Sequence, residues 1–176
     1  MILDRRTLIA GLAATPFAGP GKRLHADDFR DLKRWTIEAE KPATVTAKDG
    51  VLDIVAPAGF TAWFRPELVG PMAITYQAQA VSAGGPFDRV SDLNCFWMAR
   101  EADGGSPLDH PRSGAFAAYD PLETNYVGQG GNTNTSTRFR RYVGRAGDRP
   151  MLPRHDHSAA DELLTPNHWR TVRLIA

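Results

Sequence analysis

The chain has 176 residues, of which 42% are hydrophobic and 23% are charged, and this predicts one globular domain and excludes a second full domain. The 16 glycines and 13 prolines indicate many turns and favour a β-rich fold. The formal net charge is +1, and it falls to −2 if the four basic residues and one acidic residue of positions 1–26 are removed. The remaining domain is therefore not a general binder of polyanions such as nucleic acid.

The N-terminal segment has the pattern of an export signal. Arg5 and Arg6 precede a short, weakly apolar run at residues 7–14, which resembles a twin-arginine signal and is too short to span a bilayer. An ordinary buried N-terminal helix is the alternative. We expect residues 1–26 to be a cleaved signal peptide and residues 27–176 to be a periplasmic or secreted domain that does not bind membranes.

The first half of the chain predicts short strands divided by turn residues. Asp49-Gly50 is a hairpin signal between two runs of β-forming residues, and Pro66 ends a later run. Apolar residues alternate with Thr and Gln in residues 72–81, as in a strand with one buried face. The strands expected here are 35–40, 43–46, 51–55, 60–65 and 72–81.

Residues 89–98 predict a strand that carries polar groups on one face. The period of two places Asp92 and Asn94 on the same face as Phe96 and Met98. A carboxylate and an amide on such a face need hydrogen-bond partners, which either a polar ligand or neighbouring loops can supply. Both explanations stay open at this point.

A second polar stretch spans residues 126–142. Strands are expected at 126–131 and 136–143, and in the second of them Ser136, Arg138, Arg140 and Tyr142 share a face. Two guanidinium groups two residues apart form a cationic strip that can clamp carboxylates. The alternative is a solvated face whose arginines pair with Asp or Glu.

Together these stretches contain the residue types of a sugar site, with planar hydrogen-bonding groups, aromatic rings and positive charge for a uronate. For β-elimination at a uronate, Tyr126 and His155 are the candidates for proton transfer. Hydrolysis needs two suitably spaced carboxylates, and no spacing here is diagnostic of them. The expected substrate-binding residues are Asp92, Asn94, Asn132, Arg138, Arg140 and Tyr142.

Other chemistries have weaker signals in this sequence. His155 and His157 could hold a metal, but no third separated ligand is identifiable, so we expect no metal and no other cofactor. Cys95 is the one cysteine, which excludes an intramolecular disulfide, and a small buried hydrophobe is a commoner role for it than a nucleophile. No phosphate-binding glycine loop and no Gly-x-Ser-x-Gly elbow occurs.

The rest of the chain consists of long loops and one final strand. The loop at 100–118 is long enough to favour a functional role, and residues 144–166 predict a second loop with a short helical turn at 158–164. Residues 169–176 alternate as a strand that needs a partner. With no strand-helix alternation, the fold class expected is all-β, an antiparallel two-sheet sandwich or jelly roll.

Several segments taken as a set resemble a family of exported bacterial proteins described as a domain of unknown function. The segments are 60–78, 84–99, 119–142 and 149–156. The resemblance implies the concanavalin A-like lectin/glucanase fold and a polysaccharide context, but no known reaction. Family members are expected to continue past the last residue, so we expect this chain to lack C-terminal strands. The Glu-x-Asp-x-x-Glu pattern of glucanases with this fold is absent.

These observations predict an exported protein that acts on acidic, uronate-containing polysaccharide or oligosaccharide. If it is an enzyme, a polysaccharide lyase is the first expectation and a glycoside hydrolase the second. The alternatives are a non-catalytic carbohydrate-binding module and a structural envelope protein. A Tyr or His within reach of the space above Asn94 and Arg138 distinguishes an enzyme from a binding module.

Overall fold

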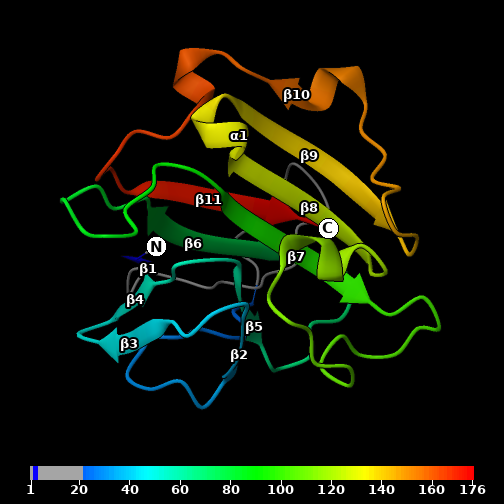
Figure 1. Cartoon of the computed structure of the whole chain (residues 1–176). Helices are drawn as coiled ribbons and strands as arrows, with labels where there is room; N and C mark the ends of the chain where they lie inside the picture. The colour runs from blue at the N-terminus through cyan, green and yellow to red at the C-terminus, as the bar shows by residue number, and fades with distance from the viewer. Residues whose placement is uncertain (1, 4–21) are drawn as a thin grey trace.

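The computed structural model describes residues 2–3 and 22–176. The described chain is mostly β, and its strands pair antiparallel (Figure 1). The expected signal peptide falls largely on residues 1 and 4–21, which lie outside the described residues. Within the described part, no helix is long and apolar enough to cross a membrane.

The strands of residues 2–3 and 22–176 form three sheets. One sheet has the order β11-β6-β1-β4-β3, the second has the order β10-β9-β8-β7, and the third is the pair β2-β5. Their bounds are β1 Ile2–Leu3, β2 Trp35–Ala39, β3 Thr44–Lys48, β4 Val51–Val55, β5 Phe60–Phe64, β6 Ala73–Gln79, β7 Leu93–Arg100, β8 Glu123–Gly130, β9 Ser136–Val143, β10 Asp156–His157 and β11 Arg170–Ile175. The short helices are η1 Phe116–Tyr119, α1 Gly131–Asn134, η2 Pro153–His155 and η3 Ala160–Glu162.

The expected hairpin and the expected final strand are both present. Strands β3 and β4 pair across Asp49 and Gly50, which have φ of 50° and 77°, as the turn of a two-residue hairpin requires. Strand β11 pairs with β6 from Arg170 opposite Ala78 to Ile175 opposite Ala73. The last strand therefore has the partner that its alternating pattern demands.

The strand expected at 89–98 is shorter than predicted at its start and irregular at its end. Asp92 has a left-handed φ of 59°, so β7 begins at Leu93, and Asp92 does not share a strand face with Asn94. Its backbone N–H donates to the carbonyl of Gly130 at 3.2 Å. Near the other end, Met98 has φ 55°, and the register shifts between Trp97 and Arg100, which marks a β-bulge.

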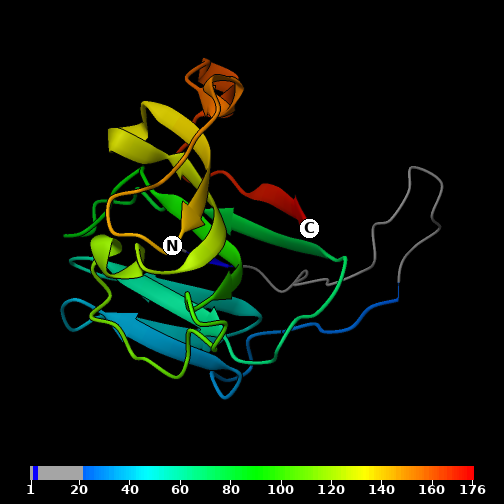
Figure 2. The same cartoon turned by 90° about the vertical axis from the view of Figure 1, so that its right-hand side faces the viewer.

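Two sheets pack against each other through an apolar layer. Cys95 and Trp97 of β7 and Phe139 of β9 belong to one cluster with Ile74 of β6 and Val172 of β11. In Figure 2, β11 (red) and the β8–β9 hairpin (yellow) accordingly lie in different layers of the molecule. This packing is consistent with a β sandwich. The core residues of β7 and β9 alternate with the residues that face the other way.

Candidate functional site

The face of β7, β8 and β9 that points away from the core cluster carries most of the predicted polar residues. The register sets Asn94 opposite Gly128 and Gly128 opposite Arg138. In the next row, Phe96 lies opposite Tyr126 and Tyr126 opposite Arg140. Both rows belong to the lining of one large hollow, which also reaches core-side residues such as Cys95 and Trp97. We call the part of it over these two rows the β7–β9 groove. Its lining includes Asn94, Phe96, Tyr126, Gly128, Arg138 and Arg140.

Tyr126 lies over Gly128, in the middle of the first row. A β-carbon at position 128 would overlap the Tyr126 hydroxyl, so the missing side chain of Gly128 makes the space that the phenol occupies. Within residues 2–3 and 22–176, that hydroxyl has no hydrogen-bond partner. The register therefore places a free phenol between Asn94 and Arg138.

The environment of Tyr126 keeps its phenol protonated at neutral pH. Burial raises its pKa well above the usual value, and the nearby Tyr142 and Asp92 raise it further. Arg140 and Arg149 act in the opposite direction. A protonated phenol can donate a hydrogen bond or a proton, and it is a poor base.

The two arginines of β9 have different charge environments. Arg138 makes a forked ion pair with Asp156 of β10, at 2.7 Å from Nε and 3.2 Å from Nη2, so its charge is already compensated. Arg138 is therefore an arginine paired with an acidic residue, which was the alternative to a carboxylate-binding role. Arg140 makes no ion pair with any described carboxylate, and its Nη1 donates only to the carbonyl of Arg149 at 3.3 Å. The charge of Arg140 helps to lower the pKa of Asp156, but Arg140 makes no ion pair with it, so its guanidinium remains available to an anionic ligand.

Asp92 and Asn132 lie where the groove meets the ends of the strands. Asp92 accepts a hydrogen bond from the Ser91 hydroxyl at 2.6 Å and pairs with Arg89 at 2.9 Å. Asn132 donates to the Ser136 hydroxyl at 3.2 Å, and its own φ is 52°. Both residues line the groove. Both also have a left-handed backbone conformation, which is strained in a residue other than glycine.

Two other predicted residues do not line the groove. Tyr142 is fully buried, its ring centre is 5.5 Å from that of Tyr126, and burial raises its pKa to about 12. It packs beside Tyr126 on the same sheet face. His155 packs edge-on against Phe139 at 5.0 Å. Because Phe139 belongs to the core side of β9, the structure does not bring His155 together with Tyr126.

Aromatic residues that sequence patterns did not reveal form one wall of the groove. Phe116 of η1 lies 5.6 Å from Tyr126 and 6.4 Å from Phe96, measured between ring centres. The guanidinium of Arg149 lies 4.7 Å from the Phe116 ring centre. Trp63 of β5 stacks on Phe96 at 6.1 Å. These residues come from three separate segments, so no spacing in the sequence could have grouped them.

A buried carboxylate connects this wall to the β2-β5 sheet. Glu38 is 5% exposed. It accepts hydrogen bonds from the Trp63 indole at 2.8 Å, from the Tyr119 hydroxyl at 2.9 Å and from the backbone N–H of Arg112 at 2.7 Å. Its donors thus come from β5, from η1 and from the long loop before η1.

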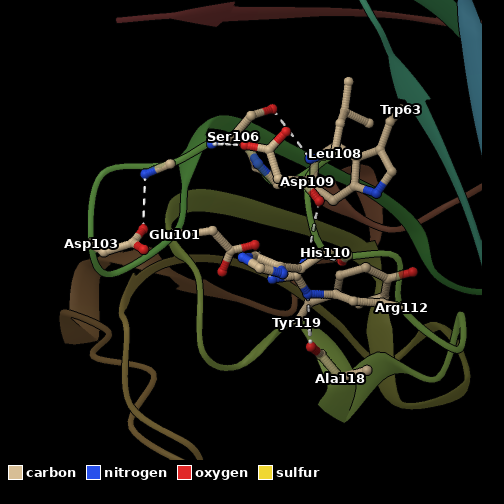
Figure 3. Close-up of polar contacts among 12 residues, drawn as sticks. Trp63, Glu101, Asp103, Ser106, Leu108, Asp109, His110, Arg112, Ala118 and Tyr119 are labelled. Atoms are coloured by element: carbon tan, nitrogen blue, oxygen red, sulfur yellow. Dashed lines mark hydrogen bonds and ion pairs between the residues drawn. The ribbon is translucent and has the colours of Figure 1, made fainter.

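The side chain of Arg112 holds that long loop in place (Figure 3). Its guanidinium donates to the carbonyls of Pro107 and His110 at 3.0 Å each and of Ala118 at 3.1 Å, and it pairs with Glu101 at 2.5 Å. Both ends of the loop are therefore tied to one buried cation, which fixes the position of η1 beside the groove.

Metal ligation and thiol chemistry have little support in the described residues. Within residues 2–3 and 22–176, no group of three His, Cys, Asp or Glu side chains could hold a metal ion, and His157 pairs with Glu162 at 2.6 Å. Cys95 lies on the core side of β7. Burial raises the pKa of its thiol to about 12, so it stays protonated and unreactive at neutral pH.

Comparison with known proteins gives one match. A family model described as a domain of unknown function, DUF6250, matches residues 54–176, which include the whole β7–β9 groove. No significant match was found among curated proteins or among solved structures.

Replacing Arg112 by methionine should destabilise the protein strongly. Arg112→Met leaves the buried Glu101 carboxylate and three carbonyls without a donor, which costs about 3–5 kcal/mol of unfolding free energy. Urea unfolding followed by circular dichroism measures the change. The matched control is Arg145→Met, because Arg145 pairs with Asp148 at an exposed position and should cost below about 1 kcal/mol. Equal losses in both variants would show that the Arg112 network does not stabilise the fold.

Cys95 should resist alkylation in the folded protein. With its pKa raised to about 12, very little reactive thiolate is present at about pH 8, so iodoacetamide should label the native protein about 100-fold more slowly than the urea-unfolded protein. Mass spectrometry over a time course measures both rates. Rapid labelling of the native chain would contradict the burial of this thiol and revive its role as a nucleophile.

Proposed function

We propose a function for this chain, which belongs to the DUF6250 family. The protein binds a uronate-containing saccharide in the β7–β9 groove and assists β-elimination there. The observation that carries the proposal is the pairing of an uncompensated cation with a free phenol. Arg140 has no carboxylate partner in the described structure, and the neighbouring Tyr126 presents its hydroxyl over Gly128.

Each residue has a defined role in this proposal. Arg140 binds the uronate carboxylate, and the amide of Asn94 adds a hydrogen bond. Neutralising the carboxylate makes the proton at C5 more acidic. Solvent water takes the C5 proton, the electron pair of the C5–H bond forms the C4–C5 double bond, the C4–O bond breaks, and Tyr126 donates its phenolic proton to the departing oxygen. Solvent then returns a proton to the Tyr126 phenolate. The product is an unsaturated uronide and a shortened chain.

The cellular setting is part of the same proposal. The antiparallel strands and the apolar layer between two sheets support a jelly roll of the concanavalin A type, which presents one sheet face as a saccharide groove. Export through a twin-arginine signal at residues 1–26 would deliver this domain to the periplasm or the exterior, where polysaccharide is available.

A second candidate is a carbohydrate-binding module without catalysis. The position of His155 supports this candidate. His155 packs against Phe139 on the core side of β9, so Tyr126 is the one predicted proton-transfer residue that lies in the groove. The raised pKa of Tyr126 also suits a hydrogen-bond donor. In this case the same residues grip the sugar and no proton moves.

Removing the phenolic hydroxyl distinguishes the two candidates. With uronate polysaccharides, the mature protein should generate the ultraviolet absorbance of an unsaturated uronide, and Tyr126→Phe should slow this reaction by about 10²- to 10⁴-fold with little loss of binding. Arg140→Ala should weaken binding, measured by calorimetry, by about 10- to 100-fold. The control is Arg138→Ala, since Asp156 already pairs with Arg138, and it should weaken binding less.

The outcomes of that experiment are separable. Binding that depends on Arg140 without any absorbance change leaves the binding module and removes the lyase. No binding and no absorbance change with any uronate polysaccharide would contradict the proposed function as a whole.

A β-carbon at position 128 should displace the Tyr126 hydroxyl. Gly128→Ala inserts a methyl group where that hydroxyl lies, so activity should fall to about the level of Tyr126→Phe, within roughly tenfold. The matched control is Gly131→Ala, whose β-carbon would meet no atom closer than 3.5 Å, and it should retain activity. Full activity in Gly128→Ala would show that the position of the phenol over Gly128 is irrelevant to function.

A further inference from the structure

Exposed apolar side chains line the same groove as the charged and polar groups. Phe116 is 40% exposed and Met98 is 42% exposed, and both belong to the groove lining. Single exposed apolar residues are common on protein surfaces. Two that line one hollow beside an uncompensated arginine form a combined surface, which offers apolar contact as well as charge.

The backbone around Met98 is strained. Met98 has a left-handed φ of 55°, and the pairing with β8 shifts register between Trp97 and Arg100. A β-bulge of this kind re-aims a side chain and occurs often beside functional sites. Such a conformation costs about 1–3 kcal/mol in a residue with a side chain. Alternation alone would place Met98 on the face of Phe96, opposite Trp97, and across the bulge Met98 lines the hollow and stays 42% exposed.

Phe116 is held rigidly in its place. Its ring contacts Phe96 and Tyr126, and Arg149 lies over it at 4.7 Å. Arg149 is in turn anchored at 2.6 Å by Asp120, whose side chain is 6% exposed. A fixed aromatic ring with exposed surface is a suitable platform for the C–H face of a sugar, because little ordering entropy is lost on binding.

The groove is longer than one sugar. Asp92 lies beside Gly130 through a backbone hydrogen bond, and Tyr126, four residues earlier on β8, pairs with Arg140. At about 3.3 Å per residue, these rows are about 13 Å apart, which exceeds the width of a single pyranose ring. Tyr126 and Arg140 therefore lie at one end of that length and Asp92 at the other.

We propose that the groove has a separate stacking subsite formed by Phe116 with Met98, so that the ligand is an oligosaccharide with a uronate on Arg140 and the next sugar on Phe116. This rests on the proposed function, because Arg140 must bind the uronate first. The subsite adds affinity by apolar contact and not by charge. It selects for chain length, whereas Arg140 selects for the carboxylate.

The test is calorimetry of the full chain with oligogalacturonates from monomer to tetramer. Wild-type affinity should rise by about tenfold with the added units. Phe116→Ala should abolish that rise. Phe116→Leu and Met98→Ala are second variants that keep most of the packing, and each should reduce the rise. The matched control is Leu152→Ala, which removes a similarly exposed apolar side chain outside the groove lining.

The outcomes separate this inference from the function on which it rests. A rise with chain length that persists in all three groove variants would overturn the subsite and leave uronate binding by Arg140 intact. If the wild type binds the monomer but its affinity does not rise with chain length, the subsite is also overturned and uronate binding by Arg140 is left intact. If no oligomer binds and Arg140→Ala changes nothing, both the subsite and the proposed function are wrong.

Discussion

The groove depends on the buried carboxylate of Glu38. A carboxylate that is 5% exposed must have its oxygens hydrogen-bonded, because an unpaired buried charge is very costly. The donors come from Trp63, Tyr119 and Arg112, so satisfying this one group fixes three separate segments relative to β2. The same contacts place η1, with Phe116 at its start, beside the sheet. A wall that is otherwise a long loop thereby becomes a rigid part of the site.

The floor of the groove follows from strand geometry. The period of two separates Cys95, Trp97 and Phe139, which pack in the core, from the residues of the other face. Antiparallel register then assembles cross-strand rows from three strands. One position without a side chain, Gly128, lets the phenol of Tyr126 lie across the row. The arrangement joins a free hydrogen-bond donor to a cation that has no ion-pair partner among the described residues.

The sequence allowed part of this site to be predicted, for identifiable physical reasons. Arg138 and Arg140 share a face because alternation alone decides that, and β9 has the expected bounds. The ion pair between Arg138 and Asp156 could not be predicted, since it forms through the two-residue strand β10. Residue type alone suggests His155 as a partner of Tyr126 in proton transfer, but its ring contacts Phe139 on the core side of β9. The left-handed backbone conformation of Asp92 could not be predicted either, because the alternation of polar and apolar residues does not indicate where a strand begins.

The central claim is that the β7–β9 groove binds a uronate through Arg140. The most direct measurement is a crystal structure of the protein with an oligogalacturonate. The account predicts a carboxylate of the ligand paired with the Arg140 guanidinium and a sugar oxygen within hydrogen-bond distance of the Tyr126 hydroxyl. A ligand bound elsewhere, or bound in the groove with its carboxylates directed away from Arg140, would contradict it.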